Sequence, residues 1–141
     1  MTVAGSERLE KLLVGLLGAL LLLAALSVSW QMLRPERRTA NLDAVMQDCL
    51  GIISAARDWH HRSERLGGAE RRGFGGLRFD RIGYGGNLSN GGMTWSNDNA
   101  RFTLQVAEDG RSFDLVAEAP GGVKVIYRGV GTGVVPNPVI R

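Results

Sequence analysis

The histidines are the first residues whose type could support metal or acid–base chemistry, and the 141-residue chain has only His60 and His61. Neighbouring positions of a helix point about 100° apart, so these rings are not placed to share a metal ion as an i, i+4 pair would be. Cys49 is the only cysteine, which excludes an intramolecular disulfide and a cysteine-based zinc site. We therefore predict no metal site, and we expect stability to come from packing or assembly.

Two glycine-containing segments match sequence motifs only superficially. Residues 129–133 (GVGTG) lack the strand–loop–helix context and the Lys-Ser/Thr ending of a phosphate-binding loop, so we interpret them as a flexible terminal strand or loop. Asn87-Leu88-Ser89 fits the glycosylation sequon, but a plain turn is the better interpretation in this glycine-rich region. Because no nucleophile elbow, HExxH, CxxC or positioned carboxylate pair is present, we predict no catalytic residues, no cofactor and no enzyme activity.

A long apolar run dominates the N-terminal quarter of the chain. Leu12 to Trp30 is rich in leucine and contains no charged residue, and as a helix it would span roughly 28 Å, the thickness of a bilayer core. It could be a transmembrane anchor, a buried oligomerisation helix or a signal peptide, with Arg8 and Lys11 before it and Ser27-Val28-Ser29 as a cleavage site. We expect the segment to be retained.

The charges around the run do not identify a partner. Seventeen Lys and Arg against fourteen Asp and Glu give a net charge of +3, which is too small to indicate a nucleic-acid partner without a clustered basic face. Arg34, Arg37 and Arg38 follow the run as closely as Arg8 and Lys11 precede it. The positive-inside rule therefore does not place the C-terminal domain outside the membrane, and it weakly favours the opposite orientation.

A second, amphipathic helix is predicted after Pro35, which would be a kink or the first helical residue. We expect this helix to begin near Thr39 or Asn41 and to end before Gly67-Gly68. Its polar face, which we expect to stay wet, carries Asp43, Gln47, Asp48, Arg57, Asp58 and Arg62. Its apolar residues recur at spacings of three and four: Leu42, Val45, Met46, Cys49, Ile52, Ile53, Ala56 and Trp59.

The remainder of the chain predicts a β structure. Ten glycines between Gly67 and Gly92 indicate a loop region, in which residues 77–84 suggest one strand interrupted by a bulge. Alternating apolar residues then predict four or five antiparallel strands, separated by turns at 97–99, 109–110 and 120–122. The alternating sets are Met93 and Trp95; Phe102, Leu104 and Val106; Phe113, Leu115 and Ala117; and Val123, Val125 and Tyr127.

One face of such a sheet is apolar and needs a cover, and the amphipathic helix can supply it. The predicted fold is α+β: a long N-terminal α-helix, apolar in its first half and amphipathic in its second, packed on a small antiparallel β-meander. We place the apolar helix at 1–34, the amphipathic helix at 35–66, and the glycine-rich loop with the sheet at 67–141. The predicted helix–sheet core comprises Leu42, Val45, Met46, Cys49, Ile52, Ile53, Trp59, Phe102, Leu104, Phe113 and Leu115.

Four charged residues, Glu7, Arg8, Glu10 and Lys11, alternate in sign just before the apolar run, and we call them the charged head. They could form a solvated collar at a membrane surface. Alternatively, they could pair with the charged heads of neighbouring subunits when such helices bundle, because a charge buried alone is costly.

In organisation, over nearly its whole length, the chain resembles the type IV pilins and the pseudopilins of type II secretion. Those proteins combine an N-terminal apolar helix, a contiguous amphipathic half, a glycine-rich loop and an antiparallel meander. Glu10 also follows Gly5 by five residues, as in the processing motif of that family. Here Ser6, Glu7 and Arg8 stand where family members carry mostly hydrophobic residues.

The resemblance implies a structural subunit of an extracellular pilus-like filament, a helical homo-oligomer that lies in the inner membrane before assembly. Its subunit interface would use the charged head and Leu12, Leu13, Leu16, Leu17, Leu20 and Leu23. Two alternatives remain. One is a bitopic membrane protein whose small β domain is a periplasmic interaction module, and the other is a secreted domain with a cleaved signal peptide.

Overall fold

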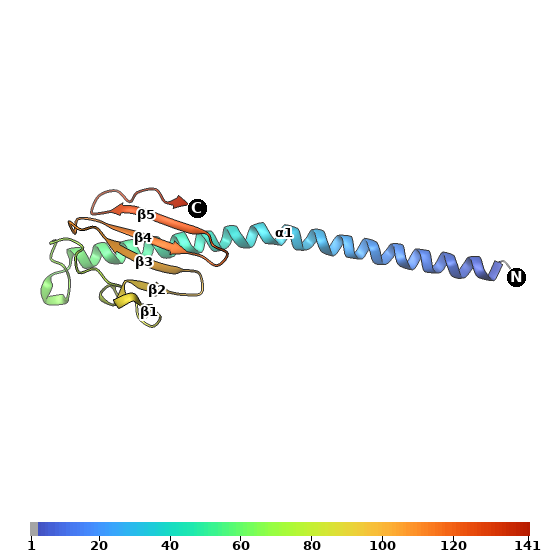
Figure 1. Cartoon of the computed structure of the whole chain (residues 1–141), viewed down its shortest axis with the longest axis horizontal. Coiled ribbons are helices and arrows are strands. Elements are labelled where there is room, and N and C mark those ends of the chain that lie inside the picture. The colour runs from blue at the N-terminus through green and yellow to red at the C-terminus, as the bar shows by residue number, and fades with distance from the viewer. Residues whose placement is uncertain (1–2) are drawn as a thin grey trace. The chain divides into compact units, whose positions relative to one another are not determined.

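The computed structural model describes the backbone of residues 3–141 and the side chains of residues 5–29 and 41–141. The chain divides into two units, Met1–Ala40 and Asn41–Arg141. One helix, α1 (Val3–His61), contributes residues to both units, and all the remaining elements belong to the second (Figure 1).

The first unit contains the apolar part of α1. Residues Gly5–Ser29 have a mean hydropathy of 2.5 and none of this surface is buried within the chain, so the segment is long and apolar enough to cross a membrane. Leucine and alanine favour the helix. The hydroxyls of Ser27 and Ser29 donate to the carbonyls of Leu23 and Ala25 one turn earlier, which satisfies the only two serine side chains of the apolar run.

The predicted boundary between two helices is wrong. The backbone of α1 is helical through Pro35, does not begin anew at Thr39 or Asn41, and ends at His61. A proline inside a helix removes one backbone hydrogen bond and costs about 3 kcal/mol. Strongly helical segments on both sides allow the helix to continue at that cost.

The second unit contains a six-stranded antiparallel sheet whose strands follow one another in chain order, which confirms the predicted α+β fold and meander. In Figure 1 the strands lie side by side, and the part of α1 that belongs to this unit lies behind them. The strands outnumber the predicted four or five because a two-residue edge strand lies on each side of the four alternating segments. They are β1 (Leu88–Ser89), β2 (Thr94–Ser96), β3 (Arg101–Val106), β4 (Phe113–Glu118), β5 (Lys124–Val130) and β6 (Val139–Ile140).

The core lies between α1 and the inner face of the sheet. Across the strands, Leu104 pairs with Leu115 and Leu115 with Tyr127, so the inward side chains form continuous apolar rows. Leu42 and Met46 are half-buried at the margin of the core. The other nine predicted core residues are buried in it: Val45, Cys49, Ile52, Ile53, Trp59, Phe102, Leu104, Phe113 and Leu115.

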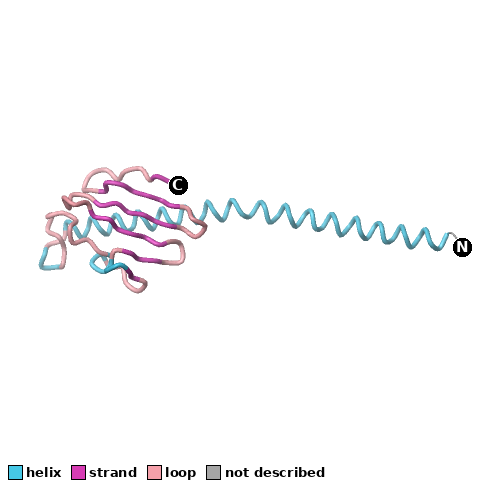
Figure 2. Tube along the Cα trace, viewed as in Figure 1, coloured by secondary structure: helices cyan, strands magenta, loops and turns pink. Residues whose placement is uncertain are grey.

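The long connection between α1 and β1 contains short helical turns in place of the predicted bulged strand (Figure 2). Phe79 and Ile82, which are both buried, open and close the 3₁₀ helix η2 (Phe79–Ile82). Three residues make one turn of a 3₁₀ helix, so this spacing puts both side chains on one face, which a strand would not do. The same connection also contains the 3₁₀ turn η1 (Glu64–Leu66), and a further one, η3 (Asn90–Gly92), lies between β1 and β2.

Candidate functional site

The candidate assembly surface is the apolar part of α1. At 100° per residue, the six predicted interface leucines fall within about 140° of the helix circumference. Much of the remaining circumference is occupied by Leu21, Leu22 and Leu26, so the helix is apolar on all sides. The six leucines of the predicted interface are all exposed, between 57% and 70%: Leu12, Leu13, Leu16, Leu17, Leu20 and Leu23.

This exposure is energetically significant. Burial of a leucine side chain contributes about 1.5–3 kcal/mol relative to its exposure to water. Six exposed leucines therefore leave on the order of 10 kcal/mol unrealised in the isolated chain. A helix that is apolar on all sides is characteristic of a surface covered by lipid or by other protein.

The charged head occupies the start of the same helix. Glu7, Arg8, Glu10 and Lys11 are all exposed. Glu7 and Lys11 are one turn apart, yet within the described part of the chain none of the four forms a salt bridge. Their charges are therefore open to solvent, lipid headgroups or the charges of a neighbouring subunit.

In the second unit, Asp48 fastens α1 to the turn between β2 and β3. Its Oδ2 accepts hydrogen bonds from the side-chain amides of Asn97 and Asn99, each at 2.9 Å. Asn97 Oδ1 in turn accepts from the backbone N–H groups of Asn99 and Ala100. The prediction that Asp48 stays wet was wrong, because its side chain is half-buried against this turn.

Arg57 makes a second polar connection from α1. Its Nε donates to the carbonyl of Gly131 at 2.9 Å, and its Nη2 donates to the carbonyl of Gly133 at 2.6 Å. The glycine segment predicted as flexible is thus held at two carbonyls, and Arg57 is half-buried instead of fully wet. Helical periodicity placed Asp48 and Arg57 on the polar face, but it contained no signal for partners so distant in sequence.

The titratable groups in the core are kept neutral. Cys49 is completely buried, and burial, followed by the neighbouring Asp48 carboxylate, raises the pKa of its thiol to about 12. Burial also raises the pKa of Tyr127, with a smaller contribution from Cys49. A thiol that stays protonated is a poor nucleophile, so Cys49 acts as a small apolar side chain.

The two histidines lie at the end of α1 with their rings 5.1 Å apart and perpendicular. His60 is buried, and burial, then His61 and Arg71, lowers the pKa of its ring. Within the described residues no three His, Cys, Asp or Glu side chains gather closely enough to hold a metal ion.

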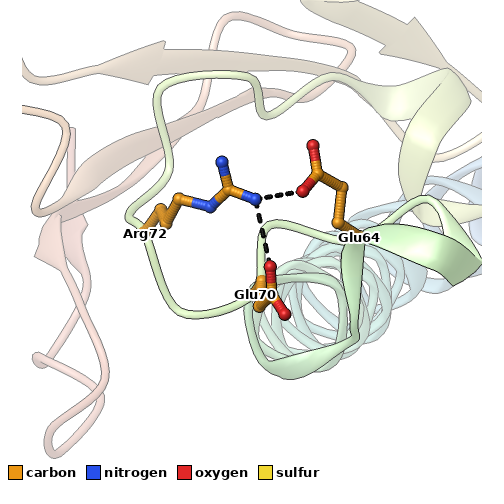
Figure 3. Close-up of polar contacts among 3 residues, drawn as sticks. All are labelled: Glu64, Glu70 and Arg72. Carbon is orange, nitrogen blue, oxygen red and sulfur yellow. Dashed lines mark hydrogen bonds and ion pairs between the residues drawn. The ribbon is translucent and has the colours of Figure 1, made fainter.

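Two of the open clefts of the second unit are lined by different loops. One, of about 430 Å³, is lined by residues of the β2–β3 and β4–β5 connections, including the Lys124–Glu118 ion pair at 2.7 Å. The other, of about 480 Å³, is lined by His60, Arg71, Arg72 and Arg111 among others. Figure 3 shows Arg72 donating to Glu64 and to Glu70, the latter at 3.0 Å. Sequence reasoning did not find this second cleft, because its cations come from separate loops.

Comparison with known proteins gives no relative for this chain. No protein-family model, no curated protein and no solved structure matches it. The functional interpretation therefore depends on the residues and their arrangement.

Proposed function

We propose that this chain is the structural subunit of an extracellular pilus-like helical filament that assembles through its apolar N-terminal helix. The observation that supports this most strongly is that no part of Gly5–Ser29 is buried within the chain, while the second unit builds its core without it. The apolar segment is not part of the core of the second unit, so its apolar character on every side supports a role between chains.

Assembly would proceed from the membrane. Before assembly, lipid would cover the apolar helix in the inner membrane. In the filament, helices from neighbouring subunits would replace the lipid and the β domains would lie outside. The charged heads would then pair between subunits, since an isolated charge in a poorly hydrated bundle is unfavourable.

The second candidate is a bitopic membrane protein whose β domain is a periplasmic interaction module. The length and hydropathy of Gly5–Ser29 favour this function as much as they favour the filament, because they satisfy the requirements of a single transmembrane span. In this case lipid covers the helix permanently, and no neighbouring helix needs to approach it.

Substitution of glycine distinguishes the two functions. At Gly15 and Gly18 a Cβ atom would have no atom of another residue within 4 Å, so a side chain can begin at either position without a clash. The changes keep the segment apolar and therefore keep membrane insertion. Packed helices need small residues for close approach, so we expect Gly18→Ile to reduce filament yield strongly, as measured by shearing and sedimentation at matched expression.

A charged substitution supplies the complementary test. Leu20→Glu would place an unpaired carboxylate in the dry centre of a filament, whereas Leu66→Glu is a matched control on an exposed residue of η1. We expect the first variant to abolish filaments and the second to assemble normally. Normal fibres from both Gly18→Ile and Leu20→Glu would contradict the filament function.

A further inference from the structure

The cleft at the C-terminal end of α1 is built from four separate segments of the second unit. The end of α1, the loop that follows η1, the β3–β4 turn and the segment after β5 all contribute to it, and it has a volume of about 480 Å³. Its lining side chains are His60, Arg71, Arg72, Asp109, Arg111 and Thr132.

The loop that carries Arg71 and Arg72 is held in place by backbone hydrogen bonds. The N–H groups of Ala69 and Arg71 donate to the carbonyls of Trp59 and His60 in the last turn of α1, at 3.0 and 2.7 Å, and that of Glu70 donates to the carbonyl of Arg62 just beyond the helix, at 2.9 Å. Glu70 and Arg71 adopt left-handed backbone angles, with φ of 49° and 61°, which non-glycine residues seldom do. Such conformations persist where the surroundings impose them, and they are concentrated at functional sites.

The same loop is fastened to the β3–β4 turn. The N–H of Phe74 donates to the carbonyl of Gly110 at 2.7 Å. At Gly73 a Cβ atom would lie only 2.7 Å from that carbonyl oxygen, so only glycine allows this approach. The approach places Arg71 of the loop and Arg111 of the turn on the walls of one cleft.

The cleft has an excess of positive charge. Arg72 shares its charge with Glu64 and Glu70 (Figure 3). Within the described part of the chain the guanidinium groups of Arg71 and Arg111 have no hydrogen-bond acceptor or carboxylate partner. The Asp109 carboxylate is the one acid in the lining, and it accepts from the backbone N–H of Arg111 at 3.0 Å.

His60 gives an independent indication of a missing ligand. Its side chain lines the cleft but is only 6% exposed, and its ring stacks on Phe74 with the ring centroids 4.7 Å apart. The ring Nδ1 is buried without a hydrogen-bond partner. Buried polar atoms in native proteins are almost always paired, but the described part of the chain provides no partner for this nitrogen.

We propose that this cleft binds the phosphate group of a small phosphorylated ligand or a free phosphate ion. Two unpaired guanidinium groups offer planar, bidentate donors, and phosphate presents enough oxygens and charge to engage both. A carboxylate has only two oxygens and can be satisfied by one arginine. The lining also contains the His60 ring, the Thr132 hydroxyl, the partly neutralised Arg72 and the Asp109 carboxylate.

The end of a helix by itself disfavours an anion, because its carbonyls carry partial negative charge. Here the backbone N–H groups of Ala69 and Arg71 donate to the carbonyls of Trp59 and His60 near the end of α1. These two carbonyls are therefore engaged within the chain, and the bound phosphate would meet the arginine side chains of the loop and turn.

The test is isothermal titration calorimetry of the full chain in dodecyl maltoside micelles, at constant ionic strength, with inorganic phosphate, glycerol 3-phosphate and acetate as probes. We expect saturable phosphate binding with a dissociation constant of about 1 mM or tighter, and much weaker binding of acetate. Tighter binding of glycerol 3-phosphate than of inorganic phosphate would identify a phosphate ester as the ligand, and equal binding would identify the free ion. Either result supports the site.

Arg71→Gln and Arg111→Gln are the informative variants, and Arg65→Gln, on the exposed turn η1, is the matched control. Each of the first two should weaken phosphate binding roughly tenfold, the effect of losing a charge-assisted hydrogen bond. Arg65→Gln should bind as the wild type does, and near-ultraviolet circular dichroism verifies that each variant is folded. The proposal is overturned if phosphate shows no saturation at about 10 mM, if acetate binds equally well, or if Arg65→Gln weakens binding as much as Arg111→Gln.

Discussion

The substitution Asp48→Ala tests how the amphipathic part of α1 is fixed to the sheet. The change removes an acceptor that holds the side-chain amides of Asn97 and Asn99 at 2.9 Å each. A hydrogen bond to a charged group contributes about 1.5–3 kcal/mol, and the half-buried position lets water replace part of it. We therefore expect a loss of about 2–3 kcal/mol for the two bonds together, which lowers the melting temperature of a domain of this size by about 10–20 °C.

The measurement is thermal unfolding of the full chain in detergent, followed by near-ultraviolet circular dichroism. Asp98→Ala is the control, because Asp98 lies in the same turn but is exposed. The melting temperature of Asp48→Asn should lie between those of Asp48→Ala and Asp98→Ala, since asparagine keeps an acceptor oxygen but loses the charge. If Asp48→Ala melts within a degree or two of Asp98→Ala, then the turn is held by backbone packing and the assigned hydrogen bonds contribute little.

Three further results are expected. Glu10→Gln should sharply lower filament yield without affecting membrane insertion, because a cation of a neighbouring charged head loses its partner; an unchanged yield would identify the head as a solvated collar. Cys49 should resist iodoacetamide at about pH 8 in the folded chain and react quickly in urea, because burial keeps its thiol protonated; rapid labelling of the folded chain would refute this. The pKa of His60 is lowered in the folded state, which therefore favours the neutral ring. The free energy of unfolding should be highest above the ordinary pKa of 6.5 and should decrease as the pH falls below it. Urea unfolding at about pH 7.5 and 5.5 measures that decrease. His60→Phe should reduce it most, and a substitution of the exposed His61 should reduce it less, because burial contributes more than His61 to the lowered pKa of His60.

Much of the fold could be predicted from periodicity alone. The spacing of three and four in the amphipathic helix identified Val45, Cys49, Ile52 and Ile53 as core residues, and strand alternation identified the inward face of β3 and β4. These patterns work because one face of each element must be buried and the other wet. The short turns were equally clear, since asparagine, aspartate and glycine favour them for conformational reasons.

Features that depend on tertiary contacts could not be predicted in this way. Phe79 and Ile82 belong to a 3₁₀ helix, and no periodic signal separates one such turn from a bulged strand. Pro35 indicated a break in α1, but the helix continues because a single local penalty does not outweigh two strongly helical flanks. Arg71 and Arg111 are 40 positions apart, and they reach one cleft only because Gly73 permits the loop to approach the turn.

Assembly through the apolar helix is the central claim, and electron microscopy of the native material, released by shearing and negatively stained, tests it most directly. A subunit that buries Gly5–Ser29 against copies of itself predicts long, thin fibres of uniform diameter that contain this chain. Dispersed monomers that remain soluble only in detergent, with no fibres at matched expression, would contradict the filament function and favour the membrane-anchored module.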